Sequence, residues 1–261
     1  MRALARAAFS AFYVSVRLRV ISPWAYLNWL VFPLIFAAVG LYVLSTPGGP
    51  ASRVVYGVFG GGLIGYWSVA YLDGGNSIQD ERWNGTLEQL FGTPTPLWVI
   101  VAGKVCGAIL FGLLAFIPTA AFAYFGFHAV LPRLDPGPFV VSLGVLTLTF
   151  FVIGLALTPL FALSRWAFSM LNGFEIAVYV FCGFMFPIAF LAPWAQAVGG
   201  VLAPTWAVRA LYASTLTEGP RDYVTWWLVA LALSAAYLVV GYALYALVER
   251  RARVSGELAL T

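Results

Sequence analysis

Residues 139–163 read FVVSLGVLTLTFFVIGLALTPLFAL, a run of 25 positions without a charged side chain. A helix needs about 20 mostly apolar residues to cross a hydrocarbon layer of ~30 Å. The run is continuous, whereas a strand of a membrane β-barrel shows alternating polarity over ~10 residues. A helix also satisfies its backbone hydrogen bonds internally, as the membrane interior requires. This stretch therefore predicts a membrane-spanning helix.

The rest of the chain has the same character. Five further apolar runs are long enough to span a membrane: Trp24–Leu44, Val54–Leu72, Leu97–Phe125, Phe168–Leu191 and Trp226–Val248. Apolar residues make up 62% of the 261-residue chain and charged residues 9%, against roughly 45–50% and ~25% in soluble domains. So few charges cannot cover a water-exposed surface, which excludes an ordinary soluble enzyme and a disordered chain. We expect one all-α integral membrane domain over residues 1–261, with six transmembrane helices.

Charge and cysteine content exclude further classes of protein. The net charge of +4 comes from 14 basic and 10 acidic residues spread along the chain, without the basic patch that nucleic-acid binding requires. Cys106 and Cys182 both lie in apolar runs, so they form neither a disulfide framework nor a metal site. We expect no nucleic-acid partner and no metal or cofactor bound by this chain.

Residues 1–20 predict an amphipathic helix that lies in the membrane surface. Arg17 and Arg19 interrupt any apolar core before Pro23, which is not typical of a cleavable signal peptide. At 100° per residue one face is polar: Arg2, Arg6, Ser10, Tyr13 and Arg17. Apolar side chains lie away from it: Leu4, Ala8, Ala11, Phe12 and Val16. Such a helix would turn its arginines toward lipid phosphates; the alternative is a mobile basic tail.

The distribution of lysine and arginine predicts the orientation, because cytoplasmic segments carry an excess of both. With six spans the two termini share one side of the membrane. That side holds ten basic residues: Arg2, Arg6, Arg17, Arg19, Arg82, Lys104, Arg165, Arg250, Arg251 and Arg253. The other side holds four: Arg53, Arg133, Arg209 and Arg221. Both termini and residues 80–96 are therefore expected in the cytoplasm, with membrane lipids around the spans.

Residues 80–96, DERWNGTLEQLFGTPTP, form a connection too long for a plain turn. Nine of its residues contain four of the 24 charges of the chain: Asp80, Glu81, Arg82 and Glu88. Thr86 can cap a short helix, and the prolines after Gly92 end it. The helix would have one apolar face: Leu87, Leu90 and Phe91. Such a helix needs a surface to pack on, either the membrane or a groove on a partner protein.

The same connection contains a recognisable motif. It reads Glu81-Arg82-x-x-Gly85-Thr86-Leu87-Glu88-Gln89-Leu90, followed by Thr93-Pro94 and by Gly103-Lys104 at the start of a span. A second pattern lies before the last span: Gly183, Phe186-Pro187, Pro193-Trp194, Pro204-Thr205 and Arg209. Together with the amphipathic N-terminus and six spans, the chain resembles the permease subunits of type-2 ATP-binding-cassette (ABC) exporters over nearly its whole length.

This resemblance implies a function for residues 80–96. In the family this segment is a coupling helix that docks in a groove of a cytoplasmic ATPase subunit. The residues implied for ATPase coupling are Glu81, Arg82, Gly85, Thr86, Leu87, Glu88, Leu90, Phe91 and Pro94. The complex would contain two permease chains, identical or related, and two ATPase subunits. The alternative is a membrane-surface loop of an unrelated six-span protein.

The chain lacks the phosphate-binding loop by which ATPases of this kind hydrolyse ATP. A phosphate-binding loop needs Gly-x-x-x-x-Gly-Lys followed by Ser or Thr. Gly103-Lys104 lacks both the upstream glycine and the following hydroxyl residue. We therefore expect no catalytic residue here, and ATP and Mg bound by the partner ATPase.

Spans 2 and 5 carry the residues implied for the transport path. Gly57, Gly61 and Gly65 are four residues apart, a spacing that lets another helix approach closely. In the resembled family these two spans lie near the permease dimer interface and the substrate path. The residues so implied are Gly57, Gly61, Gly65, Tyr66, Trp67, Tyr71, Glu175, Phe181 and Phe184. The alternatives are packing within one subunit for the glycines and lipid contact for the aromatic residues.

Charged residues in or near the spans are candidates for function, because charge in a membrane is costly. Glu175 could pair with a basic group, line a polar cavity or bind substrate, or it could reach the interface if span 5 starts later. Arg165 would lie ~15 Å away along a helix, too far to pair directly. Lys104 is expected to extend toward the interface, with an ion pair to Asp73 as an alternative.

The segment 183–212 on the outward side contains stretches too short to span. The resemblance implies a re-entrant pair of short helices that caps the outer exit, and a surface loop is the alternative. Four residues are implied for the outward gate: Pro187, Pro193, Trp194 and Pro204.

Two other classes of function are weaker. An intramembrane serine protease needs a histidine base, and the only histidine, His128, lies near the outer end of span 3. A stand-alone secondary transporter or channel is the better alternative, although residues 24–125 and 139–248 show no repeat of the kind found in carriers. The resemblance implies a multi-pass permease of the bacterial inner membrane that exports a hydrophobic or amphipathic substrate: a drug-like molecule, an antibiotic, a lipid or a lipid-linked glycan.

Overall fold

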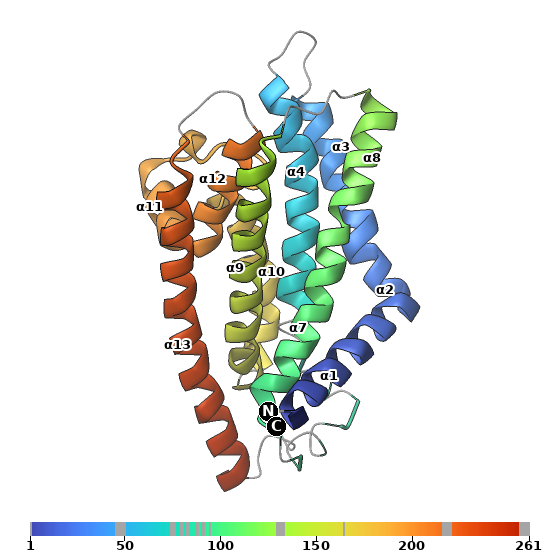
Figure 1. Ribbon diagram of the computed structural model, residues 1–261, viewed down its shortest axis with the longest axis vertical. Helices are drawn as coiled ribbons and strands as arrows, with labels where there is room; N and C mark the ends of the chain where they lie inside the picture. Colours follow the sequence, from blue (N-terminus) through green and yellow to red (C-terminus); the bar gives the residue numbers. More distant parts are fainter. Residues whose placement is uncertain are drawn as a thin grey trace.

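The computed structural model describes residues 2–44, 51–73, 77–78, 81, 84–86, 89, 92–93, 95–128, 134–163, 165–215 and 221–255. Within these residues every regular element is a helix. Long helices stand side by side as an upright bundle, and shorter ones lie at two of its edges (Figure 1). The expectation of an all-α membrane protein is confirmed at this level.

Five helical segments of the described residues are long and apolar enough to cross a membrane: Pro23–Val43, Val54–Leu72, Leu97–Phe127, Pro136–Leu160 and Tyr223–Val248. They are built from α2 (Pro23–Tyr26), η1 (Leu27–Val31) and α3 (Phe32–Leu44); α4 (Ala51–Ser68) and η2 (Val69–Asp73); α7 (Leu97–Leu114) and α8 (Phe116–Phe127); α9 (Pro136–Leu163); and α13 (Tyr223–Ser255). Each corresponds to a span expected from the apolar runs. The π-helical turns η1 and η2 lie within the first two.

The predicted span Phe168–Leu191 is wrong at its C-terminal end. Helix α10 covers Arg165–Phe181, 17 residues, or about 25 Å at 1.5 Å per residue. It ends because Gly183 takes a left-handed backbone conformation, with a φ of +69°, and Pro187 soon after has no N–H to continue a helix. The apolar composition continues past this point, but the helix does not.

Short helices occupy the chain after α10. They are η3 (Ile188–Phe190), α11 (Pro193–Val201) and α12 (Ala203–Thr215). They lie beside the upper part of α13 in Figure 1. The 13 residues of α12 and the shorter α11 cannot cross a bilayer, which needs about 20 residues.

Helix α1 (Arg2–Ile21) runs obliquely along the lower part of α7 and joins the bundle through a break at Ser22 (Figure 1). Its buried residues are Ala11 and Ser15, which face the bundle, while Arg2, Arg6 and Arg17 are exposed. Residues 1–20 were expected to form a helix with this polar face, and the structure has one there.

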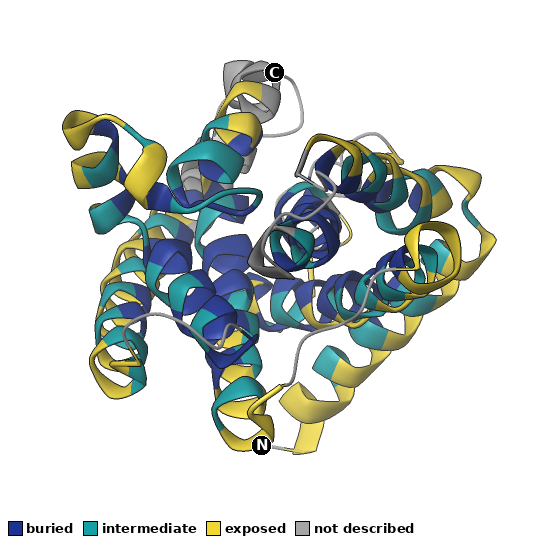
Figure 2. Ribbon diagram, turned by 90° about the horizontal axis from the view of Figure 1, so that it is seen from above, coloured by how far each residue is buried: buried dark blue, intermediate teal, exposed yellow. Residues whose placement is uncertain are grey.

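The centre of the bundle is filled with large side chains from α4 and α9 and from the turn after α10. Tyr66, Trp67, Phe150 and Phe184 are almost fully buried and in ring contact with one another. Buried residues face inward and exposed residues face outward around the bundle (Figure 2). Many of the exposed side chains are large and apolar, as expected of helices that face lipid rather than water.

Candidate functional site

Lys104, at the start of the third turn of α7, joins the segment after span 2 to the bundle. Its ammonium group forms an ion pair with the Glu81 carboxylate and donates a hydrogen bond of 3.1 Å to the carbonyl oxygen of Ser77. The side chains of Lys104 and Glu81 are only 17% and 22% exposed. Because the pair is shielded from solvent, it is screened less than a surface ion pair.

The electrostatics of Glu81 keep this contact charged at neutral pH. Burial would raise the pKa of the Glu81 carboxyl, but hydrogen bonds from Lys104 and Thr86 and the charge of Lys104 outweigh burial and hold the pKa below its ordinary value. A carboxyl with a lowered pKa stabilises the fold above its unfolded pKa and loses that contribution as pH falls through the folded pKa. The pair therefore persists near neutral pH and is lost as acid protonates Glu81.

Glu81 also shapes the turn that follows it. The backbone N–H of Thr86 donates to the Glu81 carbonyl oxygen at 2.9 Å, and the Thr86 hydroxyl donates to the Glu81 carboxylate. Gly85 closes the turn in a left-handed conformation with a φ of +69°, which glycine adopts without steric cost. One carboxylate thus connects the span end at Lys104 with the turn at Gly85 and Thr86.

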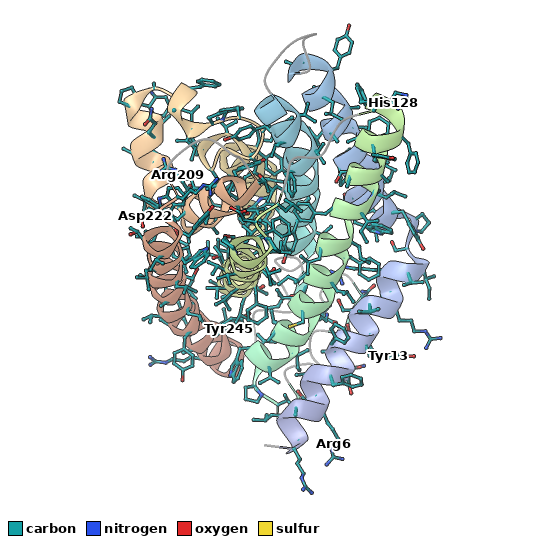
Figure 3. All side chains as sticks on the ribbon, turned by 45° about the horizontal axis from the view of Figure 1, so that its top comes forward. Arg6, Tyr13, His128, Arg209, Asp222 and Tyr245 are labelled. Carbon is teal, nitrogen blue, oxygen red and sulfur yellow. The ribbon has the colours of Figure 1, made fainter. Side chains whose placement is uncertain are left out.

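The backbone of Lys104 belongs to a second contact, between α1 and α7. The Ser15 hydroxyl donates a hydrogen bond of 3.0 Å to the Lys104 carbonyl oxygen. A Cβ on Gly103 would overlap the carbonyl oxygen of Ala8, and one on Gly107 would lie 2.7 Å from Oγ of Ser15. The two helices therefore touch along small residues, and Figure 3 shows Arg6 and Tyr13 pointing away from this seam.

Comparison with known protein families covers the region that contains these contacts. The family model of the ABC-2 type transporter matches residues 15–216. The chain belongs to the ABC-2 type transporter family. The matched region begins at Ser15 in the α1–α7 seam, includes Lys104 and Glu81, and ends just after α12. No curated protein matches the sequence significantly.

The ABC-2 permease carries three of its nine predicted coupling residues inside the described part of the chain. Glu81, Gly85 and Thr86 lie together in the turn held by Lys104. The others lie outside the described residues: Arg82, Leu87, Glu88, Leu90, Phe91 and Pro94. Lys104 was expected to extend to the interface or to pair with Asp73, and the structure pairs it with Glu81 instead.

The glycines of span 2 pack inside the ABC-2 chain. A Cβ on Gly57 would lie 3.0 Å from the Leu41 backbone nitrogen, and one on Gly61 would lie 2.6 Å from the Pro33 carbonyl oxygen. Gly65 meets Pro33 as well. The four-residue spacing had left two interpretations open: packing within one subunit, or a role at the dimer interface or in the substrate path. The contacts seen here are of the first kind. Tyr66 and Trp67 of the same helix lie in the central core.

Glu175 of the ABC-2 permease is buried between α10 and α4, and its partners are hydroxyl groups. Its carboxylate accepts hydrogen bonds from Ser68 and from Tyr179, whose hydroxyl oxygens are 2.6 Å apart. In the described part of the chain no cation forms an ion pair with Glu175. Nearby, the aromatic rings of Tyr71 and Phe174 pack against each other, with their centroids 5.7 Å apart.

The residues predicted for the outward gate fall in different environments. Pro204 is buried, Pro187 is half-buried, and Pro193 and Trp194 are exposed. Phe181 at the end of α10 lies edge-on to Trp194 at 6.0 Å, and Phe184 is in the core. The Tyr212 hydroxyl donates to the Phe184 carbonyl oxygen, which ties α12 to the turn after α10.

Proposed function

We propose that this chain is the permease subunit of an ATP-driven ABC exporter. Family membership makes it the membrane part of an ABC transporter, which implies ABC ATPase partners. One structural observation supports a coupling role for residues 80–96: Lys104 ties Glu81 to the first helix turns of span 3 and, through its carbonyl oxygen, to α1. A displacement of this segment would therefore be transmitted to both α7 and α1.

The mechanism follows from that connection. Two permease chains form the pathway, and two ATPase subunits bind beneath them at residues 80–96. ATP and Mg are bound by the ATPases, since the permease sequence has no phosphate-binding loop. ATP binds the closed ATPase pair more tightly than the open pair, and this difference in affinity drives the change of state. Lys104 passes the motion of the segment to α7 and α1, which shifts the pathway toward the outside.

The proposed cargo is a hydrophobic or amphipathic molecule, such as a drug-like compound, an antibiotic, a lipid or a lipid-linked glycan. The large aromatic side chains near Glu175 on η2 and α10 suit such a cargo, with the carboxylate as a polar contact. The helices α11 and α12 would form a re-entrant cap over the outer exit. We place the chain in the bacterial inner membrane with both termini in the cytoplasm, the side with ten of the 14 basic residues.

Co-purification tests this proposal. The permease should be co-expressed with the ATPase encoded beside it, extracted in mild detergent, and examined for a complex of two permease and two ATPase chains. Glu88→Ala and Leu90→Ala should remove the ATPase while membrane insertion stays normal. Asp222→Ala is the matched control, because this exposed acid lies at the opposite end of the bundle (Figure 3). Purification without an ATPase, with ATP-independent transport in vesicles, would assign the chain to stand-alone transporters or channels.

Gly85→Pro should abolish ATPase binding, because proline fixes φ near −65° and Gly85 needs a φ of +69°. A Cβ at this position would have no atom within 4 Å, so the effect would come from the backbone alone. Gly85→Asn should retain most of the binding, since asparagine tolerates the left-handed conformation. The measurement is the ratio of ATPase to permease after purification; equal ratios for the two variants would contradict the role of this turn.

A further inference from the structure

An apolar groove opens on the side of the bundle between α7, α9 and α13. It has a volume of about 300 Å³. Its lining includes Trp98 and Ala102 of α7, Phe151 and Leu155 of α9, and Leu238 and Tyr242 of α13. Almost all of the lining surface is carbon. We call it the α7–α9–α13 groove.

Close packing of two helices forms the floor of the groove. Gly241 of α13 rests on Ala156 of α9, where a Cβ on the glycine would lie 2.9 Å from the alanine Cα. The hydroxyl of Tyr245 donates a hydrogen bond of 3.0 Å to the Leu155 carbonyl oxygen. The proton of this hydroxyl is therefore already donated within the protein.

The groove lies within the membrane-spanning part of the chain. Each of its lining residues falls inside a segment that can cross the bilayer, Leu97–Phe127, Pro136–Leu160 or Tyr223–Val248. It is at the end of the bundle that carries Lys104 and Glu81, because Trp98 is the second residue of α7. Trp98 and Tyr242 are exposed at its rim, as aromatic side chains commonly are at the level of lipid headgroups.

Three occupants can be compared on physical grounds. Water is excluded, because a buried water needs two to four polar partners and the lining is carbon. An empty groove loses the dispersion contacts of all its lining atoms. A helix of a second chain could insert only its side chains, because a whole helix 10 Å long and about 10 Å across fills about 800 Å³. At about 30 Å³ for a methylene, near the share of a water molecule, the groove volume suits a chain of about ten methylenes.

We propose that the α7–α9–α13 groove binds one acyl chain of a membrane phospholipid. The lipid comes from the leaflet next to residues 80–96, and its headgroup lies beside Trp98 and Tyr242. An acyl chain that enters the groove only exchanges one hydrocarbon environment for another, so the hydrophobic effect adds little binding free energy. The chain is held instead by the fit of the groove. This site is independent of the ATPase partner and of the transported substrate.

Photolabelling of the full-length permease tests the site. The protein is placed in phosphatidylcholine vesicles in which a fraction of the lipid carries a diazirine on its acyl chain, and labelled residues are mapped by mass spectrometry. Groove residues such as Ala102 and Leu238 should be labelled several-fold more than Val239 and Val240. These two valines are exposed on the same helix, α13, at the same depth, but lie outside the groove.

Leu238→Trp and Ala102→Phe fill the groove from α13 and from α7, and each should reduce labelling of the groove to the level of Val240. Val240→Trp is the matched control, since it adds the same ring two residues away and should leave groove labelling unchanged. Two filling variants on different helices, each checked for a normal gel-filtration profile, guard against misfolding of either one.

Two results would overturn the proposal. One is labelling that is even along all exposed faces of α13 and insensitive to both filling variants, which would mean that ordinary surrounding lipid covers the groove. The other is loss of groove labelling as the ratio of protein to lipid is raised, which would assign the groove to a second copy of the chain.

Discussion

Lys104→Met should weaken the permease–ATPase complex by about tenfold or more, which corresponds to about 1.4 kcal/mol. The substitution keeps the length of the side chain and removes its charge, so Glu81 is left half-buried without a cation. Breaking a buried ion pair costs about 3–5 kcal/mol, and a surface pair is worth about 0–1 kcal/mol. The side chains of Lys104 and Glu81 are 17% and 22% exposed, between the buried and the surface case. We therefore expect that breaking this ion pair costs about 2 kcal/mol.

The measurement is the amount of ATPase retained by the permease across a dilution series, together with the ATPase activity of the complex in vesicles. Lys104→Arg keeps the charge and should retain most of the binding. A double-mutant cycle with Glu81→Gln should give a coupling energy of about 1–2 kcal/mol, as found for residues in direct contact. If the two single effects simply add, Lys104 does not act through Glu81.

Gly103→Val should separate α1 from α7 and destabilise the whole chain. Even a Cβ at this position would overlap the carbonyl oxygen of Ala8, and a backbone atom cannot move aside without its helix. Overpacking costs about 1–3 kcal/mol when side chains can adjust, so we expect about 3 kcal/mol here. For a chain of this size that is a fall in Tm of roughly 10 °C, at about 2–4 °C per kcal/mol.

Thermal unfolding in detergent measures this loss, and limited trypsin digestion localises it. Cleavage after Arg17 and Arg19 should become faster in Gly103→Val, because α1 no longer rests on α7. Gly144→Val is the matched control: it lies in the long helix α9, and a Cβ there would have no atom within 4 Å. A similar fall in Tm for both variants would show that valine disturbs any of these helices and that the seam has no special role.

Much of the fold could be predicted because apolar runs and charge decide which segments lie in a membrane. The end of α10 could not, because the sequence stays apolar through Leu191 and the helix is ended by the backbone of Gly183. Polarity marks where a chain leaves the membrane; it does not mark where a helix stops inside an apolar stretch. Gly183 and Pro187, taken together, were the available signal.

The candidate site was predictable in its location and less so in its contacts. The motif from Glu81 to Pro94 identified the segment, but the partner of Glu81 lies 23 residues further on, and the path of the intervening chain decides which acid Lys104 meets. The seam of α1 had a signal in the sequence. Gly103 and Gly107 have the same four-residue spacing as the glycines of span 2, and this spacing favours close helix contacts.

The hydrogen bond between Ser15 and Lys104 has a consequence for how the protein is made. The two residues are separated by 89 positions, so a ribosome adding ~5–20 residues per second completes α7 roughly 5–20 s after α1. During this interval α7, the helix on which α1 mainly packs, is not yet available. Its arginine stripe and flanking apolar side chains let it bind the lipid surface during that time. It packs against α7 once the third span has been synthesised.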